Sequence, residues 1–182
     1  GYAGETRAKI QTLSEISLQE TPRFTSGFKE LDRVLGGGIV PGSAILIGGH
    51  PGAGKSTLLL QVMCGLAKNM TSLYVTGEES LQQVAMRANR LNLPTDKLNM
   101  LSETSVEQIC NLADQLKPQI IVVDSIQVMH LSDIQSSPGS VAQVRECASF
   151  LTRYAKTRQV AIIMVGHVTK DGTLAGPKVL EH

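Results

Sequence analysis

One glycine-rich stretch, residues 49–56, restricts the folds open to this chain more than any other feature. It matches the pattern GxxxxGK(S/T), in which glycines let backbone N–H groups turn inward around a polyphosphate. Lys55 can reach the β and γ phosphates of a nucleotide, and the Ser56 hydroxyl can bind Mg²⁺. The pattern predicts a site for ATP or GTP with Mg²⁺. The residues expected to bind ATP are Gly49, His50, Pro51, Gly52, Ala53, Gly54, Lys55, Ser56 and Thr57.

The flanking sequence predicts a buried strand before this stretch and a helix after it. Residues 44–48 form a short apolar run, and residues 56–64 contain no glycine or proline. The N-terminus of such a helix adds unpaired N–H donors and a partial positive charge, which favour bound phosphate. His50 occupies a variable position of the pattern and is interpreted as a tolerated loop residue.

Apolar runs alternate with helical segments along the rest of the chain. Runs without polar alternation are typical of parallel strands buried on both faces. The sequence therefore predicts an α/β fold with a mostly parallel sheet and helices on both faces. A loop is expected over residues 131–140 and a mostly irregular tail from residue 166. Strands are expected at residues 44–48, 72–76, 97–101, 119–125 and 160–165.

Helix-start signals support this division. A short helix is expected over residues 28–35, ended by three glycines. Ser80 is placed to cap a helix over residues 81–91. Residues 104–107 and 140–143 both read as capping boxes, in which a Ser or Thr and a Glu or Gln bond each other's backbone N–H.

Composition excludes several classes of protein. The net charge is +1, with 17 basic and 16 acidic residues. The total charge therefore does not show the excess of basic residues typical of nucleic-acid-binding proteins. Aromatic residues make up 3% and Trp is absent, so no base-stacking surface is evident. Cys64, Cys110 and Cys147 are far apart, which suggests structural thiols without disulfide or metal. No apolar run is long enough to span a membrane and no signal peptide is evident, so we expect a cytoplasmic protein.

Polar side chains follow the core strands, at the edge where parallel sheets bind ligands. Asp124 ends an apolar strand, which suits a carboxylate that holds Mg²⁺ through water beside Ser56, although it could instead cap the next turn. Glu78 and Glu79 follow the second strand, where one of them could activate the attacking water. Glu78 is preferred because it is closer to the strand, and Glu79 is the substitute. Acids at this position also favour the dipole of the next helix.

His167 follows the fourth core strand. Its side chain could sense the γ-phosphate and take part in catalysis with Lys55, or it could simply hydrogen-bond at the strand end. Lys170 and Lys178 flank a glycine-containing loop and could bind a polyanion such as DNA. Solvated lysines would explain both positions equally well.

With these residues in place, the chain resembles the RecA-like P-loop ATPases, and within them the RadA (Sms) family of bacterial DNA repair proteins. The resemblance covers nearly everything from about residue 21 onward. Segments 136–146 and 165–172 are similar to stretches that are more specific to the repair family. Segments similar to the wider superfamily are its entry signature at residues 26–38, its glutamate-bearing strand at 74–80 and its Walker B strand at 122–127.

The resemblance implies a DNA-dependent ATPase of recombinational repair that uses ATP and Mg²⁺ and drives branch migration like a ring helicase. The implied partners are single-stranded or branched DNA, other copies of the chain in a hexameric ring, and a recombinase such as RecA. Loops at residues 131–140 and 168–178 would line the ring channel. Lys170 then becomes a stronger candidate for DNA contact.

Several features of that family are missing from this chain. The family carries an N-terminal four-cysteine zinc module, so zinc is expected in the full-length protein but not here. A Lys-Asn-Arg-Phe-Gly motif, thought to act on a neighbouring subunit's nucleotide, and a Lon-protease-like domain are also missing. We therefore expect residues 1–20 to be a linker or arm and residues 21–182 to be an incomplete ATPase domain that binds nucleotide but hydrolyses it poorly.

Two other functional classes use the same phosphate-binding stretch. A small-molecule kinase would need an acceptor pocket and usually an arginine-rich lid, and no such lid is evident in the sequence. In a nucleotide-switched assembly protein, ATP would control the oligomeric state without motor work. The sequence leaves that second class open.

Overall fold

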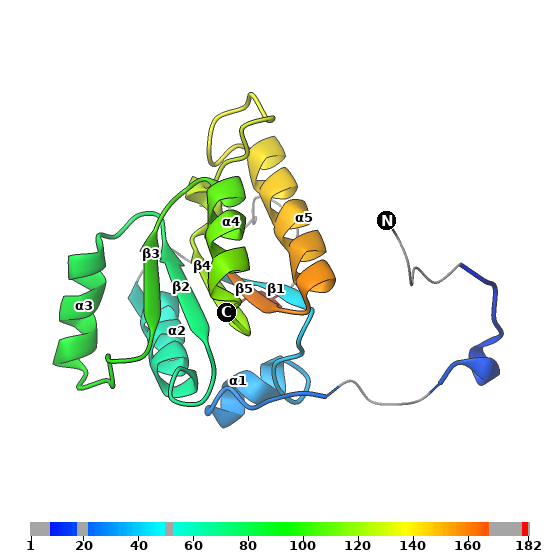
Figure 1. Ribbon diagram of the computed structural model, residues 1–182, viewed down its shortest axis with the longest axis horizontal. Coiled ribbons are helices and arrows are strands. Elements are labelled where there is room, and N and C mark those ends of the chain that lie inside the picture. The colour runs from blue at the N-terminus through cyan, green and yellow to red at the C-terminus, as the bar shows by residue number, and fades with distance from the viewer. Residues whose placement is uncertain (1–7, 18–21, 50–52, 168–179, 182) are drawn as a thin grey trace.

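A parallel six-stranded sheet, in the order β3-β2-β4-β5-β1-β6, forms the centre of the molecule (Figure 1). The computed structural model describes residues 8–17, 22–49, 53–167 and 180–181. The predicted α/β fold with a mostly parallel sheet is confirmed. The strands are β1 (Ala44–Gly49), β2 (Ser72–Thr76), β3 (Asn99–Ser102), β4 (Ile120–Asp124), β5 (Ala161–His167) and β6 (Leu180–Glu181).

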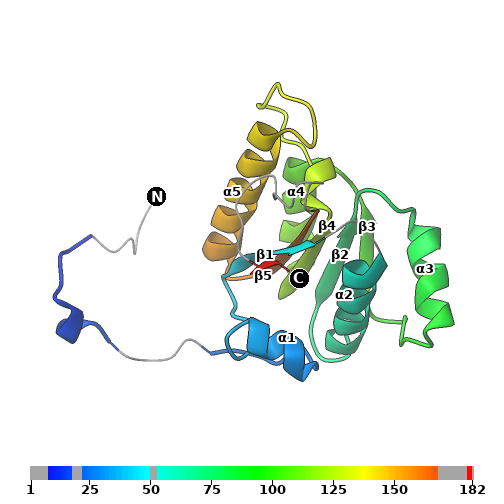
Figure 2. The same cartoon turned by 180° about the vertical axis from the view of Figure 1, so that it is seen from behind.

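Helices cover both faces of this sheet, as Figures 1 and 2 show from opposite sides. The α-helices are α1 (Lys29–Val34), α2 (Ala53–Leu66), α3 (Leu81–Arg90), α4 (Val106–Leu116) and α5 (Val141–Arg158), and the short 3₁₀ helices are η1 (Leu13–Glu15) and η2 (Ile126–Val128). Helices α2, α3, α4 and α5 lie in the segments that connect the strands from β1 to β5, because a parallel connection must cross from one end of the sheet to the other, whereas η1 and α1 precede β1.

Two hydrophobic clusters separate cleanly by strand face, because successive side chains of a strand point in opposite directions. On one face, Val75 and Val123 pack with residues of α4 and α5. On the other face, their neighbours Tyr74 and Val122 pack with residues of α1, α2 and α3. Burial on both sides explains why these strands read as continuous apolar runs.

The start of α3 confirms the predicted cap. The Ser80 hydroxyl oxygen accepts a hydrogen bond from the Gln83 N–H, and the Gln83 side chain accepts one from the Ser80 N–H. The predicted box at residues 104–107 is wrong. The cap of α4 is Ser105, whose hydroxyl accepts from the Gln108 N–H. Glu107 instead accepts from Ser132, outside the helix.

The predicted box at residues 140–143 is half correct. The Ser140 hydroxyl accepts from the Gln143 N–H at the start of α5. The buried Gln143 amide does not return to Ser140. Its Oε1 accepts from the Leu131 N–H at 2.9 Å, and its Nε2 donates to the carbonyls of Ile134 and Ser136.

The end of the chain also departs from expectation. The tail was predicted to be irregular from residue 166, but β5 continues through Gly166 to His167. Leu180–Glu181 then adds β6 alongside β1. Residues 168–179 lie outside the described part of the chain.

All three cysteines lie buried in helices: Cys64 in α2, Cys110 in α4 and Cys147 in α5. Each thiol is therefore part of the packed interior. None of the helices in the described part of the chain is both long and apolar enough to cross a membrane.

Candidate nucleotide-binding site

Strand pairing brings the predicted polar strand ends to one edge of the sheet. Gly49, the first residue of the phosphate-binding pattern, pairs with His167. Asp124 pairs with Thr76 on one side and with Val165 on the other. The ends of β1, β2, β4 and β5 therefore lie together, at the carboxyl edge where such sheets bind ligands.

The phosphate-binding stretch connects β1 to α2. His50, Pro51 and Gly52 lie outside the described residues. Burial lowers the pKa of the Lys55 ammonium group, which lies in the first turn of α2. The same turn has N–H groups without helical partners and carries the positive end of the helix dipole. The pattern residues at this end of the helix are Ala53, Gly54, Lys55, Ser56 and Thr57.

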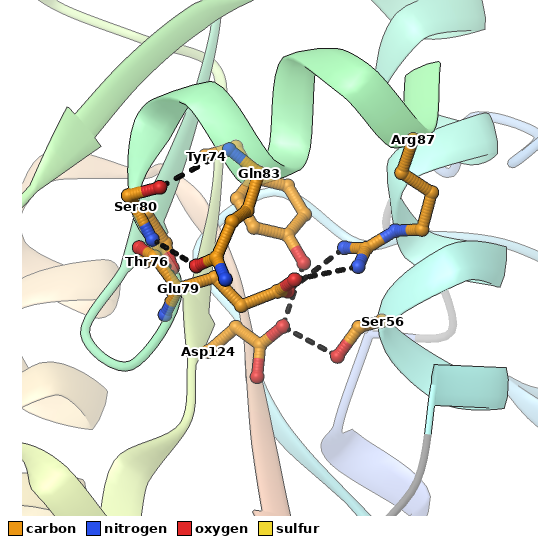
Figure 3. A network of polar contacts seen from close by, with 8 residues as sticks. All are labelled: Ser56, Tyr74, Thr76, Glu79, Ser80, Gln83, Arg87 and Asp124. Carbon is orange, nitrogen blue, oxygen red and sulfur yellow. Dashed lines mark hydrogen bonds and ion pairs between the residues drawn. The ribbon is translucent and has the colours of Figure 1, made fainter. Parts of the chain in front are cut away.

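Two hydroxyl groups hold the buried carboxylate of Asp124 (Figure 3). The Ser56 Oγ donates to Asp124 Oδ2 at 2.6 Å, and the Tyr74 hydroxyl donates to the same oxygen at 2.7 Å. Burial and the adjacent carboxylate raise the pKa of Tyr74, so the phenol stays protonated and remains a donor. Asp124 Oδ1 accepts no hydrogen bond from the described residues. One carboxylate oxygen is thus fixed by two hydroxyl groups.

These oxygens fit Mg²⁺, which prefers hydroxyl, carboxylate and phosphate oxygens and retains several waters. Ser56 would contact the ion directly and Asp124 would hold it through water. In the described part of the chain, no three His, Cys, Asp or Glu side chains come together as a metal site. Two protein oxygens suit an ion that also binds nucleotide phosphates, rather than one held in an all-protein cage.

The adjacent glutamates have different surroundings. Glu79 forms a two-point ion pair with Arg87 of α3, with N–O distances of 2.7 and 2.9 Å (Figure 3). The Arg87 side chain is only 13% exposed, and its buried Nε has no hydrogen-bond partner among the described residues. The hydrogen bond to Glu79 is the largest of the effects that raise the pKa of Arg87. Glu79 is therefore bound within the protein.

Glu78 instead lies among groups from neighbouring strand ends. Its Oε1 accepts from the Ser125 hydroxyl at 3.4 Å, and its Oε2 lies 3.8 Å from His167 Nε2. About half of the Glu78 side chain is exposed, at 48%. These two contacts are long, and the half-exposed side chain leaves the carboxylate accessible to water. The catalytic roles of Glu78 and His167 stay predictions.

Three residues at this edge were missed by sequence reasoning: Tyr74, Arg87 and Gln127. Tyr74 is the one polar-tipped aromatic in an otherwise apolar stretch of β2, which was a usable signal. Arg87 is one of two basic residues on α3, and no local pattern distinguished it from Arg90. Gln127 pairs with the His167 backbone through a tertiary contact that no local pattern indicates.

The candidate DNA-binding residues are only partly described. Lys170 and Lys178 lie outside the described residues. The loop over residues 131–140 is described and contains no Lys or Arg. It is held from inside by Gln143 and from outside by Glu107. Any contact with phosphate would therefore use backbone N–H groups, hydroxyl groups or the exposed Gln135 amide as donors.

The fold and this site define a RecA-like P-loop ATPase domain. Residues 11–173 match the family model of an AAA domain, and the chain belongs to that family. A KaiC-like protein from the archaeon Pyrococcus horikoshii has a similar structure, with a TM-score of 0.67 over 85% of this chain and 74% of its own. At 18% identity, that likeness supports the fold alone.

Within this class, the chain belongs to the family of the bacterial DNA repair protein RadA. It is 94% identical to RadA of Haemophilus influenzae, 75% to that of Escherichia coli and 50% to that of Bacillus subtilis, over the whole chain in each case. The resemblance inferred from the motifs is confirmed. The chain spans 40% of the length of each of these relatives.

Proposed function

We propose that this chain is the ATPase core of a DNA repair motor, in which DNA-dependent ATP hydrolysis drives branch migration. The observation that carries the proposal is the meeting of Ser56, Asp124, Glu78 and His167 beside the phosphate-binding stretch. The family membership supports the repair role, because the relatives are named as DNA repair proteins.

Each residue has a distinct part in the proposed reaction. The stretch from Gly49 to Thr57 binds the ATP phosphates, and the Lys55 ammonium offsets their charge. Ser56 and Asp124 would hold Mg²⁺, which would neutralise charge on the phosphate oxygens. Glu78 accepts a proton from the attacking water.

His167 senses the γ-phosphate in this proposal. It lies beside Gly49 in the sheet and faces Glu78 at 3.8 Å, so a change at the phosphate can alter the contact between the two side chains. Glu79 has a supporting part, because its ion pair with Arg87 fixes the turn that carries Glu78.

The proposal extends to partners. Single-stranded or branched DNA would be bound by the loop at residues 131–140 and by Lys170 and Lys178. Other copies of the chain would form a hexameric ring, a recombinase such as RecA would act with it, and the protein would work in the cytoplasm. Residues 21–182 serve as the ATPase domain and residues 1–20 as the linker that precedes it.

The decisive experiment measures ATP turnover by the intact protein with and without single-stranded DNA. We expect Mg²⁺-dependent turnover that rises on addition of DNA. Turnover without stimulation, combined with ATP-dependent assembly, would instead favour a nucleotide-switched assembly protein. Phosphate transfer to an added nucleoside or sugar would favour a small-molecule kinase.

A further inference from the structure

We propose that Gln127 is a positioning residue that couples the DNA-binding loop to the nucleotide site, by holding His167 through its backbone. The inference rests on the proposed function and deepens it, because it assigns a route by which DNA could change the rate of hydrolysis. Gln127 lies on η2, between Asp124 of the metal site and the loop at residues 131–140.

The Gln127 amide binds the last residue of β5 at two points. The His167 N–H donates to Gln127 Oε1 at 3.1 Å, and Gln127 Nε2 donates to the His167 carbonyl oxygen at 3.3 Å. A side-chain amide here makes the pair of bonds that a neighbouring strand would make. Because the pair holds the backbone, the direction of the His167 imidazole toward Glu78 depends on the position of η2.

The same short segment reaches the proposed base. Ser125, two residues before Gln127, donates to Glu78 at 3.4 Å. Ile126 and Met129 are fully buried, so the segment is anchored in the core between these polar contacts. One rigid turn therefore contacts both Glu78 and His167, the two groups proposed to act on the water and the γ-phosphate.

The other end of the segment continues directly into the loop. Leu131 is buried, and its N–H donates to the Gln143 side chain, which also binds the carbonyls of Ile134 and Ser136. A loop built around one buried amide moves as a unit rather than residue by residue. Displacement of this loop by DNA would be transmitted through η2 to Gln127 and then to His167.

The test combines Gln127→Met, which keeps the volume but removes both hydrogen bonds, with Gln108→Met as the control at an exposed glutamine of α4. Hydrogen exchange of the intact protein without DNA measures whether the hydrogen bond from the His167 N–H to Gln127 is present. We expect the His167 amide to exchange about five- to tenfold faster in Gln127→Met, for the loss of one hydrogen bond. The control should leave that amide unchanged.

ATP turnover with and without single-stranded DNA then measures the coupling between the loop and the nucleotide site. In Gln127→Met we expect the ratio of DNA-stimulated to basal turnover to fall to near one, whereas Gln108→Met should keep the wild-type ratio. Unchanged exchange at His167, or faster exchange with full stimulation, would overturn the inference. A wild-type protein that DNA does not stimulate would overturn the proposed function itself. Gln127→Ala serves as a second variant if the methionine disturbs folding.

Discussion

Glu78 and Glu79 were both candidates for the base that activates water, and their surroundings in the structure differ. Glu79 is fixed by two short bonds to Arg87, whereas Glu78 makes only long contacts and is half exposed. A base must accept a proton from water, so a carboxylate already engaged with a guanidinium is poorly suited to the task. The geometry therefore supports Glu78, the preferred candidate, over its substitute.

Replacing each glutamate separately tests this division. We expect Glu78→Gln to lower ATP turnover by at least about 10²-fold, the usual contribution of a general base, while ATP binding persists. Glu79→Gln should keep measurable turnover but destabilise the fold by about 1–2 kcal/mol, because Arg87 loses its charged partner. Turnover, nucleotide binding and unfolding are measured for both variants. Loss of turnover in Glu79→Gln alone would reverse the assignment.

The limits of prediction at this scale follow from the reach of each side chain. Ser56 and Asp124 were predicted because their chemistry is tied to a local strand or loop pattern. Tyr74 contacts Asp124, which is 50 positions away in the sequence, and Gln127 contacts His167, which is 40 positions away. Such contacts depend on the strand order, which a local pattern does not contain.

Among the elements, η2 packs directly against the turn that carries Glu78. A methyl group on Gly77 would lie 2.5 Å from Val128 Cγ2 and 3.0 Å from Met129 Cε. Val128 is β-branched and its χ1 angle is restricted, so its methyl group cannot retreat easily. Glycine at this position lets the exit from β2 and the 3₁₀ turn after β4 approach each other.

Gly77→Ala should therefore destabilise the protein by about 1–3 kcal/mol through overpacking. Gly65→Ala is the matched control, because a methyl group there meets no atom within 4 Å and the residue lies in α2. The control should be neutral or gain up to about 1 kcal/mol from higher helix propensity. Denaturant unfolding compares the two variants, and equal stabilities would contradict the packing argument.

Helix starts show where element-level prediction fails. Ser80 forms the expected cap, and Gln83 completes a capping box there because both partners belong to the same turn. Glu107 and Gln143 had the right spacing, but each has a tertiary partner in the loop at residues 131–140. Sequence spacing indicates only which backbone groups a side chain can reach within its own turn. In the folded chain, Glu107 and Gln143 bind groups of the loop instead.

At the scale of the whole molecule, the alternation of strands and helices was sufficient to predict a parallel sheet with two covered faces. The strand order was not predicted, because every core strand is apolar and any of them could occupy a central place. The addition of β6 was also missed, since two residues carry no periodicity. The shared sheet nevertheless places one cluster of apolar side chains on each face.

The three buried thiols make this two-layer packing chemically measurable. Cys64 lies in the layer of α2, and Cys110 and Cys147 lie in the other layer, where burial raises the pKa of each thiol to about 12. Reaction with an alkylating reagent requires the thiolate, so it reports transient opening of each layer. We expect bound nucleotide to slow alkylation of Cys64 most, because the phosphate site begins its helix. Equal slowing of all three, read by mass spectrometry, would mean that the layers open only together.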